Sequence, residues 1–318
     1  MSEHETDPGS RMPARRRLGI AVLAIAAIVG AALALTLVAG GGSSEAIVRD
    51  PHGGSIAKSE LDRILLATER ATVALPRAEL EARGEKLFDS SAMAKPGESC
   101  ASCHVIGGGV NATLGVITHP REPGDFRGLR DAPSLWDVAL TAPYNWVGGN
   151  HTLEAQAATA ITTHFKNEAG DATAENVAAL VAFLRTIRAP VTRHDQGRLT
   201  AQELAGEEVF VGKGGCIACH GGPQFTDNQI HDTDVPQNTS ADAELGGPAN
   251  DPGSPAVPQG FNTPHLRDVR NTAPYMHNGV LDTLEAVVDF YDQNAITGGP
   301  LRLTADEKAA LVAYLETL

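Results

Sequence analysis

Two short segments carry the residue types in this sequence that are best suited to chemistry. One reads Cys-Ala-Ser-Cys-His and ends at His104, and the other reads Cys-Ile-Ala-Cys-His and ends at His220. In a C-x-x-C-H motif the two thiols are spaced to form thioether bonds with one haem, and the histidine reaches the haem iron. The sequence therefore predicts two covalently bound c-type haems, attached through Cys100, Cys103, His104, Cys216, Cys219 and His220.

Two other kinds of site also use cysteine pairs. A thioredoxin-like dithiol requires a βαβ context, which the sequence pattern does not have. A zinc site would require the two pairs to converge from separate parts of the chain, and the histidine after each pair would have no role. All four cysteines lie in the two motifs, so none remains for a general disulfide framework.

Composition narrows the class of partner. The formal net charge of −14 argues against nucleic acid, because binding to phosphate needs clustered Lys and Arg. An acidic surface instead favours a basic or neutral redox partner. Hydrophobic residues make up 42% of the chain, but aromatic residues make up only 4%. Two buried cores are therefore expected, in which large prosthetic groups replace aromatic bulk.

The first 45 residues are expected to lie outside the folded part. Four arginines between positions 11 and 17 precede an uncharged apolar run at 18–39, which is long enough to cross a hydrocarbon core of roughly 30 Å as a helix. Basic residues stay on the cytoplasmic side, so an inner-membrane anchor would leave the rest of the chain in the periplasm. A cleavable signal peptide is the alternative, although its apolar region is usually shorter.

The remaining chain repeats itself. The segment Ala-Pro-Ser-Leu-Trp-Asp-Val leads into Thr-Ala-Pro-Tyr ending at Tyr144, and Thr-Pro-His-Leu-Arg-Asp-Val leads into Thr-Ala-Pro-Tyr ending at Tyr275, an offset of 131 residues. Four such landmarks recur in the same order, which is typical of a duplicated unit. After the anchor at 1–45 and a linker at 46–74, we therefore predict homologous domains at 75–190 and 195–318.

The coarse pattern of the repeated part is helical. Apolar residues at three- and four-residue spacing predict helices at 153–165 and 284–291, and further helical patterns at 79–88 and 201–210 lead into the cysteine motifs. Threonine N-caps predict two terminal helices, at 173–187 and 304–315. No alternating strand pattern stands out. The expected fold class is all-α: two tandem cytochrome-c-like haem domains after an N-terminal transmembrane helix.

Several motifs resemble those of the bacterial di-haem cytochrome c peroxidase family, which includes the methylamine-utilisation enzyme MauG. They are Gln-Phe-Thr-Asp-Asn at 224–228, Thr-Ala-Pro-Tyr-Met-His-Asn-Gly at 272–279 and Thr-Leu-Glu at 283–285, and the resemblance covers almost all of 80–318. It implies two cytochrome-c-like domains with a calcium ion and an electron route between them. It also implies that the first haem reduces hydrogen peroxide, with electrons that a small cytochrome c or cupredoxin delivers to the second. Family members are often homodimers.

The resemblance also implies roles for residues outside the haem motifs. Tyr291 matches the distal ligand of the second haem, which is Met in the peroxidases and Tyr in MauG; a core aromatic residue is the alternative, and Met276 is another soft ligand. Trp146 matches the relay between the haems, or is a packed indole. Gln156 matches a glutamine of the peroxidase pocket, or lies at the surface. The implied calcium ligands are Asp131, Thr272 and Pro274, although Asp131 could instead be a turn residue.

One position departs from the family pattern. Ten residues after the pocket glutamine, where the family has its catalytic glutamate, this chain has Lys166. Lysine is a poor base, because its unperturbed pKa is about 10.4. His164 or Glu168 would then serve as the distal acid and base, or His164 would bind the iron and close the site.

The roles of three further histidines and the choice among three functions are not decided by the sequence. The resemblance places His119 near the position of a loop histidine that caps the first haem in resting peroxidases, or His119 is a surface residue, as His151 and His194 are expected to be. Besides a peroxidase, the sequence fits a non-catalytic di-haem electron carrier, which the replaced glutamate favours. It also fits a MauG-like oxidase of another protein, which Tyr291 favours.

Overall fold

The computed structural model describes residues 47–49, 55–91, 99–106, 114–116, 131–164, 173–235, 260–294 and 299–318. These residues belong to one compact unit, 45–318, and their secondary structure is mostly helical, as predicted. The predicted anchor at 18–39 lies outside the described residues. Among the helices that are described, none has both the length and the apolar character needed to cross a membrane. The proposed domain boundary near 190–195 stays a prediction.

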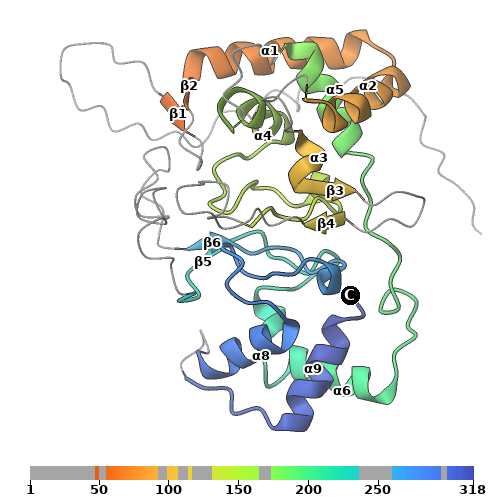
Figure 1. Ribbon diagram of the computed structural model, residues 1–318, viewed down its shortest axis with the longest axis vertical. Coiled ribbons are helices and arrows are strands. Elements are labelled where there is room, and N and C mark those ends of the chain that lie inside the picture. The colour runs from red at the N-terminus through yellow and green to blue at the C-terminus, as the bar shows by residue number, and fades with distance from the viewer. Residues whose placement is uncertain are drawn as a thin grey trace, which may run out of the picture. The chain divides into compact units, whose positions relative to one another are not determined.

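Four helices pack together in the first half of the unit (Figure 1). Their core contains the fully buried side chains of Phe88, Ile161 and Val177. A short helix, α3 (Cys100–Cys103), carries the first cysteine pair and packs against this core. The four packed helices are α1 (Lys58–Ala74), α2 (Arg77–Asp89), α4 (Leu153–Thr159) and α5 (Ala174–Leu184).

A second group of three helices has a separate apolar core in the second half. Phe210 and Tyr314 meet across it at 5.3 Å between ring centroids, and both are buried. A turn of 3₁₀ helix, η5 (Cys216–Ala218), carries the second cysteine pair. The three helices are α6 (Ala201–Val211), α8 (Leu284–Gln293) and α9 (Ala305–Leu315).

A glycine lies at the corresponding helix crossing in each group. A Cβ atom on Gly84 of α2 would lie 2.0 Å from the Ala179 carbonyl oxygen of α5, and a Cβ atom on Gly206 of α6 would lie 2.0 Å from the Ala310 carbonyl oxygen of α9. Only glycine lets two helix backbones approach so closely. Ala179 and Ala310 are separated by the repeat offset of 131 residues. The internal repeat therefore extends to the packing of the helix pairs.

The loops that contact these helices repeat as well. Asp137 and Asp268, both with positive φ, precede the 3₁₀ turns η3 (Val138–Leu140) and η6 (Val269–Asn271). Aspartate tolerates this left-handed conformation better than most residues. After each turn come a cis proline and an isolated antiparallel bridge: Ala142-Pro143 with Tyr144 to Asn150, and Ala273-Pro274 with Tyr275 to Leu281.

Short antiparallel strand pairs complete the described structure. Each strand is only two or three residues long, so an alternating pattern has too few residues to be recognised in the sequence. The pairs are β1 (Ile47–Arg49) with β2 (Ser55–Ala57), β3 (His104–Ile106) with β4 (Leu114–Val116), and β5 (Ile230–His231) with β6 (Phe261–Asn262).

Helix α1 corrects the expected linker at 46–74. It packs against α4 and α5 and buries Leu61 and Thr68. Its N-cap residue, Ala57, makes no side-chain capping hydrogen bond, so the usual start signal is missing. A helical spacing is nevertheless present in the sequence, at Leu61, Ile64, Leu65 and Thr68, and it could have predicted this helix.

The predicted helix at 153–165 is divided. The regular α-helix α4 ends at Thr159 and continues as one wider π-helical turn, η4 (Ala160–His164). Such turns occur mostly as insertions in α-helices and are frequent at functional sites.

Candidate functional site

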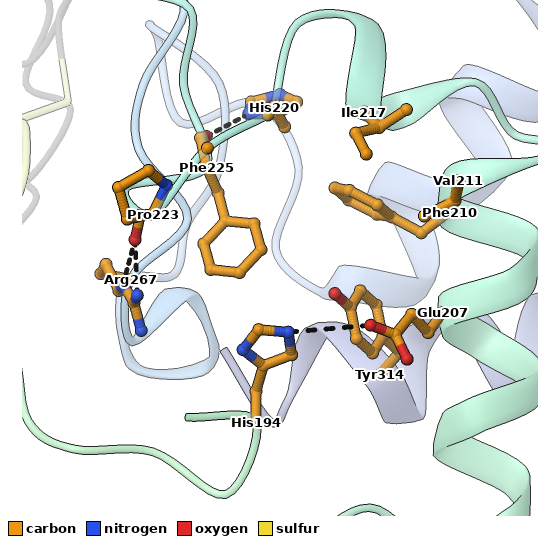
Figure 2. A pocket seen from close by; sticks show the side chains of 12 residues that line it. His194, Glu207, Phe210, Val211, Ile217, His220, Pro223, Phe225, Arg267 and Tyr314 are labelled. Atoms are coloured by element: carbon orange, nitrogen blue, oxygen red, sulfur yellow. Dashed lines mark hydrogen bonds and ion pairs between the residues drawn. The ribbon is translucent and has the colours of Figure 1, made fainter. Parts of the chain in front are cut away.

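The second cysteine motif presents a histidine whose ring orientation is determined by the backbone. His220 Nδ1 lies 2.9 Å from the Phe225 carbonyl oxygen (Figure 2). A carbonyl oxygen only accepts, so Nδ1 must donate, and Nε2 is left as the nitrogen with a free lone pair. Histidines that bind metals are typically held in this way. Burial lowers the pKa of His220, which favours the neutral ring that a metal requires.

Both cysteines of this motif are free and partly buried. Burial raises the pKa of Cys216 to about 11, and it also raises the pKa of Cys219. The turn begins after Gly215, whose φ of 63° would strain any side-chain-bearing residue. The motif thus places two protonated thiols and one imidazole nitrogen on a single tight turn, as thioether attachment of a haem requires.

Tyr291 of α8 lies beside these thiols. Burial, with smaller contributions from the neighbouring Cys216 and Cys219, raises the pKa of Tyr291 to about 12, and a hydrogen bond with Thr233 opposes the rise. Tyr291 is thus buried close to the second cysteine pair, and its role as a haem ligand stays a prediction beside the alternative of a core aromatic residue. Met276, the other suggested ligand, is the first residue of a turn whose Gly279 amide donates to its carbonyl, and it has a φ of 73°.

The first cysteine motif begins with a capped helical turn. The Ser99 and Ser102 side chains form a reciprocal capping box at the start of α3. Burial raises the pKa of Cys100 to about 12, and neither thiol is in a disulfide. His104 begins strand β3, where it pairs with Val116. Residues of both motifs thus fit covalent haem attachment, one in each half of the unit.

Trp146 joins the two halves through hydrogen bonds. Its indole Nε1 donates to the Asp131 carbonyl oxygen at 2.7 Å, and the Asp131 amide donates to the His277 carbonyl oxygen at 2.9 Å. The Trp146 carbonyl also accepts from the Asn262 amide at 2.8 Å. His277 is buried, stacks on Phe261 at 3.8 Å and meets the Trp146 ring edge-on at 6.4 Å. The predicted relay residue therefore lies at a polar contact between the halves.

The suggested calcium ligands come from segments that meet at this contact. Asp131 is 7% exposed, and its amide bonds to a residue three positions after Pro274. Thr272 donates its hydroxyl to the Val269 carbonyl. Carboxylate and carbonyl oxygens are the ligands that calcium prefers.

Gln156 and His164 both lie in the helix predicted at 153–165. Gln156 is half-buried, and its Oε1 accepts from Asn150 Nδ2 at 2.9 Å and is 3.5 Å from Asn145 Nδ2. It therefore belongs to an amide cluster and is not a free surface side chain. His164 is the last residue of η4. Lys166, Glu168 and His119 lie outside the described residues.

One cavity of about 200 Å³ lies behind the second motif (Figure 2). His220, Phe210, Tyr314 and Arg267 line it, together with His194. His194 was expected at the surface, but it packs edge-on against Tyr314 at 5.8 Å, and its Nε2 lies 3.8 Å from the Glu207 carboxylate. His151, by contrast, is exposed as expected.

Sequence reasoning missed an acidic and basic pair next to Cys219. Asp227 and His231, with Cys219, form the one group among the described residues whose Cys, His and Asp ligand atoms all lie within 4.8 Å. Burial raises the pKa of Asp227, but hydrogen bonds from His231 and the Gln229 amide outweigh it, so the pKa is lowered overall. Because Cys219 belongs to the haem motif, the pair lies at the haem attachment. Asp227 was part of a matched motif, but nothing marked His231.

Two further residues missed by the sequence reasoning are buried at the contact between the halves. Trp136 Nε1 lies 3.2 Å from Asp268 Oδ2, and both side chains are buried. The two residues are 132 positions apart in the chain, so a local sequence pattern could not have predicted their contact.

The chain is similar to known proteins over most of its length. Residues 78–189 match the family described as di-haem cytochrome c peroxidase. The chain is 32% identical to cytochrome-c peroxidase IdrP2 of Denitromonas iodatirespirans, over 73% of this chain and 78% of that protein. It is 33% identical to methylamine utilization protein MauG of Methylorubrum extorquens, over 74% and 77%. A solved structure of a MauG-like protein associated with microbial copper homeostasis matches with a TM-score of 0.59 at 26% identity, over 76% of this chain and 88% of that one.

Proposed function

Because this chain belongs to the di-haem cytochrome c peroxidase family, we propose that it reduces hydrogen peroxide with electrons from a small redox protein. Peroxide would react at the haem held by Cys100, Cys103 and His104, and electrons would enter at the haem held by Cys216, Cys219 and His220. The observation that carries this proposal is the hydrogen-bonded link from the Trp146 indole through the Asp131 backbone to His277. This link crosses between the halves that bear the two motifs, and it supports the proposal that electrons pass between them.

The protein's own residues prepare each haem for a different task. When bound, the haems supply iron centres that accept and donate single electrons. The Phe225 carbonyl keeps His220 in the tautomer that presents Nε2 to the iron. On the first side, the Gln156 amide cluster would position peroxide by hydrogen bonding, and His164 would move the proton between its two oxygens. Asp131, Thr272 and Pro274 would hold calcium at the contact and stiffen it.

The setting of the reaction belongs to the same proposal. The apolar segment 18–39 would anchor the chain in the inner membrane, with the haem domains at 75–190 and 195–318 in the periplasm. A small cytochrome c or cupredoxin would deliver electrons there. A homodimer, as family members often form, would be compatible with this arrangement.

A MauG-like oxidase is the second candidate, and the position of Tyr291 favours it. The phenol lies beside Cys216 and Cys219, where an iron held by His220 would be within the same small region. Its pKa of about 12 means that the free phenol is neutral near pH 7, so binding to iron would have to release its proton. A phenolate ligand would hold that haem at low potential and favour its oxidised states.

The test uses the purified holoprotein, with and without calcium. We would record its absorption and electron paramagnetic resonance spectra in the oxidised and half-reduced states and then add one equivalent of peroxide. A high-spin signal from one haem that disappears with peroxide is the expected result. The variant His104→Gly should lose the high-spin signal and keep the spectrum of the second haem. His220→Gly should keep the high-spin signal and lose the spectrum of the second haem. Two low-spin haems in every state, indifferent to peroxide and cyanide, would instead indicate an electron carrier.

A further inference from the structure

We propose that Trp136, hydrogen-bonded to the buried carboxylate of Asp268, is a redox-active tryptophan that gives up an electron more readily than Trp146. The inference rests on the proposed function for its natural oxidant, which is the haem system after reaction with peroxide. It concerns a residue to which the resemblance assigns no role.

The first argument is the burial of the pair. Trp136 is 6% exposed and Asp268 is 2% exposed, and Trp136 Nε1 donates to Asp268 Oδ2 at 3.2 Å. The indole comes from the first half of the unit and the carboxylate from the second. Water screens such a buried interaction weakly, so the negative charge acts on the indole more strongly than it would at the protein surface.

The second argument concerns the charge state of Asp268. Its Oδ2 accepts from Trp136, and its Oδ1 accepts from Asn271 Nδ2 at 2.7 Å. Arg270 Nε lies 3.6 Å from the same Oδ1. Both carboxyl oxygens are acceptors and a guanidinium is near, so the ionised carboxylate is the form that satisfies all three contacts. A carboxylate next to an indole N–H stabilises the positive charge that appears when the indole is oxidised.

The third argument is the contrast with the other tryptophan. The chain contains only two, and Trp146 Nε1 donates to a neutral backbone carbonyl, that of Asp131. A hydrogen bond to a charged acceptor is stronger than one to a neutral acceptor by about the energy that changes an equilibrium five- to tenfold. The same difference applies to the oxidised indole, in which the N–H is more acidic. Trp136 should therefore be the more easily oxidised of the two.

The fourth argument concerns His265, which lies between the second haem motif and Asp268 in the sequence. His265 lies three residues before Asp268, and its ring is close enough to His220 and to Asp137 to feel their charges and hydrogen-bonds with the Ser134 backbone. His265 Nδ1 accepts from the amide of Arg267, which lines the cavity behind His220. His265 thus lies in the electrostatic neighbourhood of both His220 and Asp137, the residue that follows Trp136, and away from the hydrogen bonds of Trp146.

The redox step is simple to balance. Peroxide takes up two electrons and two protons and leaves as two water molecules. Trp136 would supply one of these electrons through the bound haem system, and the donor protein would supply the other. The indole proton stays within the 3.2 Å hydrogen bond, shared with or transferred to Asp268 Oδ2. An electron from the donor protein restores the indole and returns the proton.

The experiment uses the holoprotein with two separate oxidants. In one arm, flash-generated ruthenium(III) tris-bipyridine removes electrons without any need for peroxide chemistry; in the other, stoichiometric hydrogen peroxide is added. Oxidised tryptophan is located by tandem mass spectrometry, and the radical is followed by transient absorption. We expect more product at Trp136 than at Trp146 in both arms. We also expect Asp268→Asn to lower the Trp136 product about five- to tenfold.

Asp137→Asn is the matched control. Asp137 occupies the equivalent position in the repeat, also has a positive φ and is also buried, but its carboxylate has Arg188 at 3.9 Å, whereas both indoles donate elsewhere. This variant should leave the Trp136 product unchanged. If Asp268→Asn does not fold, the ratio of Trp136 product to Trp146 product in the native protein still shows which tryptophan is oxidised more readily.

Three results are informative beyond the expected one. More product at Trp146 than at Trp136, or a Trp136 product that is the same in Asp268→Asn and the native protein, would overturn the inference. Preferential oxidation of Trp136 in the ruthenium arm, with no reaction in the peroxide arm, would support the inference and contradict the proposed peroxidase function.

Discussion

Replacing Gly206 with alanine would test whether close packing of α6 on α9 holds the second haem motif in place. The new Cβ atom would lie 2.0 Å from the Ala310 carbonyl oxygen and 2.7 Å from Tyr314 Cβ, where real contacts are at least 3.0 Å. The nearest atom belongs to the backbone, so no rotamer change can relieve the clash, and the helices must move apart by about 1 Å.

The expected loss of stability combines two opposing effects. Overpacking of a close contact typically destabilises by about 1–3 kcal/mol, and a clash with backbone lies at the upper end of that range. Alanine gains about 1 kcal/mol over glycine in helix propensity. The net loss is therefore about 2 kcal/mol, which for a folded part of this size lowers Tm by about 4–6 °C.

Thermal unfolding would be followed by circular dichroism together with the absorption of each haem. Gln202→Ala, an exposed change on the same helix, is the control and should alter stability by less than about 0.5 kcal/mol. Gly84→Ala should weaken the first half by a similar amount, because its Cβ would lie 2.0 Å from the Ala179 carbonyl oxygen. Gly206→Ala with unchanged Tm and unchanged second-haem absorption would refute the reasoning.

Tyr291, Asp131 and Glu203 carry the other predictions. Tyr291→Phe should change the second haem from six- to five-coordinate, and Tyr291→Met should raise the reduction potential of that haem. An unchanged absorption spectrum in Tyr291→Phe would exclude the Tyr291 phenol oxygen as a ligand. Asp131→Ala should weaken calcium binding by at least about tenfold, measured by isothermal titration, and equal affinities would place the ion elsewhere. Burial raises the pKa of Glu203, but hydrogen bonds from Thr200 and Arg193 outweigh it, so the folded pKa lies below the usual 4.5. Its stabilisation is thus present above pH 4.5 and lost as the pH falls through the folded value. Urea unfolding should show Glu203→Gln about 1 kcal/mol less stable at pH 7, with the gap closing at low pH, while the exposed Glu208→Gln shows no gap.

Elements with strong local signals could be predicted from the sequence. Thr173 and Thr304 cap α5 and α9 as expected, and in each the threonine oxygen accepts from the backbone three residues on. These signals are local, since the cap and the first turn contain all the interacting groups. The cysteine motifs are equally local, and both form tight turns as thioether attachment requires.

Features that depend on distant residues could not be predicted in the same way. The bond between Trp136 and Asp268 and the packing of His194 on Tyr314 join positions far apart in the chain. Helix α1 lacks a capping residue and obtains its stability by packing on α4 and α5, so a local reading placed a linker there. Tertiary contacts, which sequence periodicity does not report, decided each of these cases.

The contact of Trp136 with Asp268 also bears on the symmetry of the molecule. These positions correspond to Arg267 and Asp137 in the other repeat, and a twofold contact between identical copies would require those two residues to meet as well. Instead Arg267 forms an ion pair within its own half, and Asp137 has Arg188 at 3.9 Å. The two halves are therefore not interchangeable at this contact. A chain built from two first halves would contain an indole on both sides of the junction, and a chain built from two second halves would contain none.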